Sequence, residues 1–135
     1  MRKFKELRVW QDAVSLTEKI YRITNEPAFS KDFGLKDQIR RATFSISSNI
    51  AEGDERGSNR QSVHSFNIAK GSSAEVITQL NIAFRIGYLD KDSFEALERE
   101  TDLIRASLKN LIKARGGDTP LFQISWFIFK IFKPI

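Results

Sequence analysis

Residues 35–50 read LKDQIRRATFSISSNI, and their apolar side chains recur at a helical spacing. The steps are four, three, four and four residues, which place one set of side chains on a single face of an α-helix: Leu35, Ile39, Ala42, Ile46 and Ile50. The opposite face carries Lys36, Arg40 and Ser47. This pattern predicts an amphipathic helix that ends near Gly53.

Three further stretches have the same period. The first runs from Phe4 to Ile23 and is ended by Asn25-Glu26-Pro27, because proline disfavours helical geometry in the residue before it. A loop through Phe33-Gly34 is expected to lead into the helix described above. The next helix is expected to start at the capping box Ser58-Asn59-Arg60-Gln61 and to run to about Ile86, with Gly87 closing it. The last is expected to be capped at Asp92-Ser93-Phe94-Glu95 and to run into Lys113 and Arg115.

No segment between Met1 and Arg115 alternates with period two over the length of a strand. The sequence therefore predicts an all-α fold, an antiparallel up-and-down four-helix bundle, with residues 1–115 as its one domain.

Composition excludes several classes of function. The chain has 135 residues, with 22 Lys and Arg against 17 Asp and Glu, a formal charge of +5 and a pI near 9.6. It has no cysteine and one histidine, His64, so a thiolate nucleophile, an iron–sulfur cluster and a Cys-ligated zinc are excluded. We expect no cofactor, no metal site and no catalytic residues. With no secretory signal and no run of about 18 to 20 apolar residues, the expected location is the cytoplasm.

The apolar C-terminal segment, residues 116–135, is unusual. Residues 116–120 (GGDTP) indicate a break, a cap and a proline at a first helical position, and the rest is mostly Leu, Ile, Phe and Trp. We expect a helix that packs on its own bundle or on a neighbouring subunit, with Trp126 and Phe127 in the contact, because such a patch left exposed would aggregate. Interfacial membrane attachment is less favoured, and an altered reading-frame end is a third alternative.

Four motifs occur in order along the chain: residues 4–13 (FKELRVWQDA), 33–42 (FGLKDQIRRA), 45–53 (SISSNIAEG) and 68–75 (IAKGSSAE). Together the sequence resembles the bacterial four-helix-bundle proteins named for 23S rRNA intervening sequences (S23 ribosomal protein-like) over about residues 4 to 112. It is distantly similar to the accessory protein of diversity-generating retroelements. The resemblance implies a homopentamer with an electropositive surface, a suspected role in binding nucleic acid and no catalytic activity. Residues 28–32 and the tail depart from the family pattern.

Basic residues near the predicted second helix are candidates for contacting phosphates, since Lys and Arg gain affinity by releasing condensed counterions. The candidates are Lys36, Arg40, Arg41, Arg56 and Arg60. Helical geometry places Lys36 and Arg40 on one face and turns Arg41 by about 100°. The alternative is a solvated face with ion pairs to Asp37, Glu52 or Glu55, each of which contributes little.

Small and hydrogen-bonding residues interrupt the middle of two predicted helices, where a simple apolar core would not place them. They are Asn49, Glu52, Gly53, Gly71, Ser72, Glu75 and Gln79. We interpret them as structural or interface residues that permit close helix packing, polar networks or subunit contacts. Paired-carboxylate chemistry or a metal site at Glu52 and Glu75 is the weaker alternative.

Two hypotheses for the function follow. The first is a non-enzymatic, oligomeric nucleic-acid-binding protein in which several copies multiply a modest basic patch. The second is a structural or adaptor module that binds a protein partner, for example an enzyme, without binding RNA or DNA.

Overall fold

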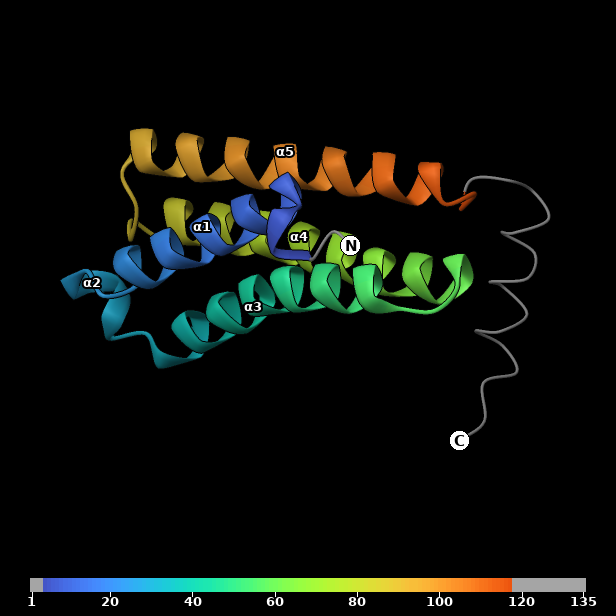
Figure 1. The fold of residues 1–135 in the computed structure, drawn as a ribbon. Coiled ribbons are helices and arrows are strands. Elements are labelled where there is room, and N and C mark those ends of the chain that lie inside the picture. The colour runs from blue at the N-terminus through green and yellow to red at the C-terminus, as the bar shows by residue number, and fades with distance from the viewer. Residues whose placement is uncertain (1–3, 118–135) are drawn as a thin grey trace, which may run out of the picture.

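A computed structural model describes residues 4–117. Residues 4–117 form a 3₁₀ turn, η1 (Phe4–Glu6), four long helices and one short helix, without a strand. The helices are α1 (Arg8–Ile23), α2 (Pro27–Ser30), α3 (Phe33–Glu55), α4 (Asn59–Arg85) and α5 (Lys91–Ala114). Successive long helices run in opposite directions, with α3 beside α1 and α4, and α5 beside α4 and α1 (Figure 1). The predicted all-α four-helix bundle is confirmed.

The helix starts differ from the prediction at three places. The first is α1, which starts at Arg8, whereas the predicted helix starts at Phe4, because residues 4–6 form the separate turn η1. The predicted loop through Phe33-Gly34 is wrong, because the carboxylate of Asp32 accepts the Leu35 N–H at 3.1 Å and so starts α3 at Phe33. The last helix starts at Lys91, before the predicted cap at Asp92, because Asp90 accepts from the Ser93 N–H at 2.8 Å and from its hydroxyl at 3.0 Å. These two bonds from Ser93 hold the pKa of the Asp90 carboxyl below its ordinary value.

Two further start and stop signals are confirmed. The Ser58 hydroxyl caps α4 by accepting from the Gln61 N–H at 3.3 Å. Gly87 follows α4 with a φ of +87°, a conformation that other residues rarely adopt.

The core lies between the four long helices. From α3 it contains Ile39, Ala42, Ile46 and Ile50, as the spacing predicts, while Leu35 is half-buried at the edge. The other helices add fully buried side chains, of which the larger are Leu16, Ile20, Phe29, Phe66, Leu80, Ile104 and Leu108. This continuous apolar centre explains how a chain without disulfides holds one fold.

One end of the bundle gathers the end of α3, the start of α4 and the end of α5. The Gly53 backbone lies so close to the Phe66 ring that a Cβ there would sit 2.5 Å from it. The Ser62 hydroxyl donates to the Gly53 carbonyl at 2.6 Å. The Arg115 guanidinium lies over the same ring at 5.6 Å and pairs with Asp54 at 3.8 Å. This end carries two of the predicted phosphate-binding residues.

Among residues 4–117, no helix has the length and apolar character needed to cross a membrane. The predicted C-terminal helix and the contacts expected of Trp126 and Phe127 lie outside the described residues.

Candidate nucleic-acid interface

The five basic candidates fall into two groups on the bundle. Lys36, Arg40 and Arg41 lie in the first half of α3, whereas Arg56 and Arg60 flank the connection to α4. At 1.5 Å per residue, Lys36 and Arg56 are about 30 Å apart along the helix axis. The structure therefore offers two separate basic clusters.

Arg40 connects two helices. Its guanidinium donates to the Thr24 hydroxyl at 2.9 Å, to the Asn25 side-chain oxygen at 3.1 Å and to the Tyr21 carbonyl at 3.3 Å. The same group stacks 4.1 Å from the centre of the Tyr21 ring. A cation at this position also suits the negative end of the α1 dipole. The donors of Arg40 are thus directed into the protein.

Lys36 lines the same shallow hollow as Arg40, whereas Arg41 does not. The Arg41 side chain is 75% exposed and pairs with Asp37, one turn earlier, at 2.9 Å. Lys36 is half-buried beside the exposed ring of Phe33 in a shallow hollow at the start of α3. The surface around these basic residues also contains the exposed Phe33 ring and the Asp37 carboxylate, so it is not uniformly basic.

The connection between α3 and α4 is the more open cluster. Every residue from Glu55 to Gln61 is exposed, and none has an apolar side chain. Arg56 pairs with Glu52 on its own helix at 2.9 Å, and Arg60 lies in the first turn of α4. A helix N-terminus carries a partial positive charge, so anions are stabilised beside it.

Arg115 is a functional candidate that the sequence analysis did not select. Its ion pair with Asp54 places it at the end of the bundle that carries Arg56 and Arg60. The sequence showed only that Arg115 lies in the last turn of a predicted helix. A basic residue there is already explained by the negative end of the helix dipole. Only the tertiary contact shows that it belongs with this cluster.

Most of the excess charge lies at the chain ends. Four basic residues, Arg2, Lys3, Lys130 and Lys133, and the acidic Asp118 lie outside the described range, so the ends hold three of the five excess charges and residues 4–117 hold two. A phosphate-binding surface on the bundle must therefore depend on local placement of Arg and Lys.

Three of the predicted structural or interface residues lie between or beside α3 and α4. Ser72 donates across the interface to the Ser45 hydroxyl at 2.8 Å, and Asn49 donates to the Ser45 carbonyl at 2.8 Å. Gly53 makes the close approach to Phe66. Ser72 and Gly53 therefore connect the two helices, while Asn49 bonds to Ser45 within α3.

Glu52 and Glu75 lie far apart. The Ser72–Ser45 and Ser62–Gly53 contacts give the register of the antiparallel pair, so Glu75 is level with about Ala42 and lies about 15 Å along the axis from Glu52. Both carboxylates are on exposed residues. Within residues 4–117, no group of three or more His, Asp or Glu could hold a metal ion.

The remaining candidates lie on the outer face of α4. Gly71 and Glu75 are exposed, and Gln79 is half-buried, with a side-chain oxygen that has no hydrogen-bond partner among residues 4–117. Around them, three isoleucines are more than 40% exposed: Ile68, Ile82 and Ile86. We call this surface, made of Gly71, Glu75, Gln79 and the three isoleucines, the α4 face.

The model of a family described as 23S rRNA-intervening sequence protein matches residues 5–110. The chain belongs to this family. A 1.70 Å crystal structure of a protein of unknown function from the S23 ribosomal protein family of Bacteroides thetaiotaomicron VPI-5482 has the same fold, with a TM-score of 0.72 and 25% sequence identity. The alignment covers 78% of this chain and 98% of that one. No curated protein matches the sequence.

Membership of the 23S rRNA-intervening sequence protein family agrees with the resemblance drawn from the four motifs. The match ends before Lys113, so the apolar tail lies beyond the family's common part. Nothing in the family match or in the structural neighbour points to an enzyme activity.

Proposed function

We propose that this member of the 23S rRNA-intervening sequence protein family is a non-enzymatic homo-oligomer, a pentamer as the resemblance implies, that binds RNA or DNA. The binding surface is the connection between α3 and α4, with Arg56 and Arg60 as its principal phosphate contacts. Lys36 and Arg41 are two weaker candidates on the same helix, about 140° apart around its axis. We assign Arg40 to the bundle.

The exposed α3–α4 connection is the observation that carries this proposal. It combines two arginines, the positive end of the longest helix and polar side chains that donate hydrogen bonds to phosphate oxygens. Arg115 lies at the same end. The Arg56–Glu52 pair is exposed and lies within one helix, so exchanging the carboxylate for a phosphate costs little.

Assembly turns a modest cluster into an effective surface. When several copies present the same connection to one nucleic acid, the second and later contacts are intramolecular, and their effective concentration is high. We therefore expect weak binding per subunit, tight binding by the oligomer and little sequence preference, because phosphate contacts carry no sequence information.

The Arg56→Glu plus Arg60→Glu variant tests the nucleic-acid surface. We expect binding of a structured RNA and a duplex DNA, measured by fluorescence anisotropy across a salt series, to weaken about 10- to 100-fold at about 0.1 M salt. The slope of log K against log salt should shrink by about two for each bound subunit, one per lost phosphate contact.

Arg99→Glu plus Arg105→Glu on the exposed face of α5 is the matched control, since it changes the net charge equally. Equal losses of affinity in both variants would show that binding depends on the net charge of the protein and not on a local surface. If the parent protein fails to bind either nucleic acid at low salt, the adaptor hypothesis is preferred. The exposed side chains of Phe33 (77%) and Leu103 (64%) favour that second function, because each would suit a protein partner.

The α4 face is our candidate for the contact between subunits. Ile82→Glu plus Ile86→Glu is expected to convert the oligomer into smaller species by light scattering, with unchanged helical circular dichroism, because both side chains are about half exposed in the single chain. Ala106→Glu plus Asn110→Glu, exposed on α5 with the same spacing, is the control. An unchanged molar mass of the isoleucine variant would exclude the α4 face as the subunit contact.

A further inference from the structure

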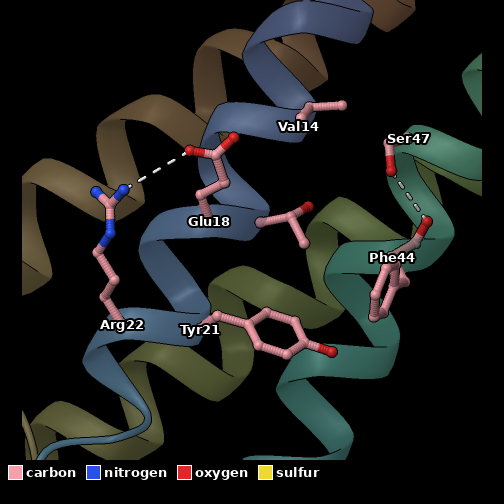
Figure 2. A pocket seen from close by; sticks show the side chains of 7 residues that line it. Val14, Glu18, Tyr21, Arg22, Phe44 and Ser47 are labelled. Atoms are coloured by element: carbon pink, nitrogen blue, oxygen red, sulfur yellow. Dashed lines mark hydrogen bonds and ion pairs between the residues drawn. The ribbon is translucent and has the colours of Figure 1, made fainter.

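A groove of about 590 Å³ lies between α1 and α3 on the outside of the bundle. Its walls are largely apolar, formed by Val14, Thr17 and Tyr21 from α1 and Phe44 from α3. Figure 2 shows Val14, Tyr21 and Phe44 extending toward the space between the two helices. The Tyr21 and Phe44 rings meet edge to face, with centroids 5.6 Å apart.

The groove presents apolar surface that the bundle itself does not cover. Phe44 is 50% exposed, whereas Ile20 and Ile46 on the inner faces of the same two helices are completely buried. Exposed aromatic side chains that line a concave surface are typical of a docking site. The nucleic-acid surface proposed above makes no use of this groove.

We propose that the groove is occupied by the apolar tail of the same chain, residues 121–132. This segment reads LFQISWFIFKIF, nine apolar residues with one glutamine, one serine and one lysine. The segment lies after residues 5–110, which are the part of the chain that the family model matches. Burying it in the groove removes two apolar surfaces from water in one step.

The chain is long enough to reach. Phe44 lies 11 residues before the end of α3, about 17 Å along the helix axis. The described chain ends at Gly117 near the same end of α3, since a Cβ at Gly117 would contact Val63 at the start of α4. Ten extended residues span about 33 Å, and 18 residues follow Gly117.

The rim of the groove carries one carboxylate and one guanidinium, Glu18 and Arg22. The Glu18 carboxylate is largely exposed, and its partner Arg22 is 3.8 Å away, an ion pair of long geometry. The tail has two lysines, Lys130 and Lys133, placed among its apolar residues. A tail lysine beside Val14, Tyr21 and Phe44 would be a second partner for Glu18, in addition to Arg22, so the charges at the rim are compatible with this occupant but do not select it.

Disulfide formation tests this proposal, and the absence of native cysteines makes the test clean. Ser47→Cys at the groove is combined in the full-length chain with one tail substitution at a time: Phe122→Cys, Trp126→Cys, Phe129→Cys or Phe132→Cys. We expect at least one pair to oxidise at least ten times faster than the same tail variant combined with Lys109→Cys on α5, and to migrate as a monomer under non-reducing conditions. Adding Phe44→Glu, which changes a half-exposed side chain, should slow that pair about tenfold.

The other results overturn the proposal. Equal rates at the groove and at Lys109 would show that the tail samples the whole surface. Disulfides found only between chains would place the tail on a second copy, and insensitivity to Phe44→Glu would separate the tail from the groove.

Discussion

Phe66→Ala is expected to lower the free energy of unfolding by about 3 to 5 kcal/mol, the usual cost of removing a fully buried phenylalanine. The Phe66 side chain is completely buried, and three elements meet on it. Gly53 of α3 packs against its edge and Arg115 of α5 lies over its face, so a cavity there loosens the end of the bundle. Urea unfolding measures the change.

A second substitution at the same contact serves as its control. Gly53→Ala brings a methyl group to 2.5 Å from the ring, a clash of about 1 to 3 kcal/mol, against a gain of about 1 kcal/mol from helix propensity. In a Phe66→Leu background the clash is relieved, and we expect Gly53→Ala to be neutral or stabilising there. Equal costs in the two backgrounds would show that the Gly53–Phe66 contact is not the cause.

Arg40→Ala is expected to cost about 2 to 3 kcal/mol, because three hydrogen bonds from one charged group and its stacking on Tyr21 are lost together. The loss frees the end of α1 from α3. Arg40→Lys keeps the charge but not the planar fork of donors, so it should recover less than half of the stability.

Arg41→Ala is the matched comparison, one residue along the same helix. Its exposed pair with Asp37 contributes about 0.5 kcal/mol or less. If Arg40→Ala left stability unchanged and instead weakened RNA binding, Arg40 would return to the phosphate-binding set. Because Arg40 connects α1 to α3, a charge reversal at this residue would destabilise the fold. A loss of binding in such a variant would not identify Arg40 as a phosphate contact.

The bundle was predictable from the sequence because its main signal is periodic. The step of Ile39, Ala42, Ile46 and Ile50 coincides with the turn of a helix, and those side chains are in the core. The helix starts were less predictable where two acids compete for one cap. Asp90 and Asp92 both precede Phe94, and only the backbone conformation decides that Asp90 accepts from Ser93.

The sequence named the basic residues of the candidate site, but it did not show which of them contact other helices and which face solvent. Arg40 and Arg41 are equivalent as neighbouring letters, yet one helical step turns the first toward Tyr21 and Thr24, sixteen or more residues away along the chain, and leaves the second in solvent. Gly53 was recognised as a residue of close packing, but its partner Phe66 lies on another helix. Such pairings depend on the tertiary register, which a single sequence does not display.

The two contacts that align α3 with α4, Ser62 to Gly53 and Ser72 to Ser45, lie about 12 Å apart along α3. Sliding one helix past the other by a turn would break both at once, together with the fit of Gly53 against Phe66. These contacts therefore hold α3 and α4 in one register, and the connection between them has its shape before any ligand binds. A ligand that binds the α3–α4 connection does not have to order this segment, so little conformational entropy is lost on association.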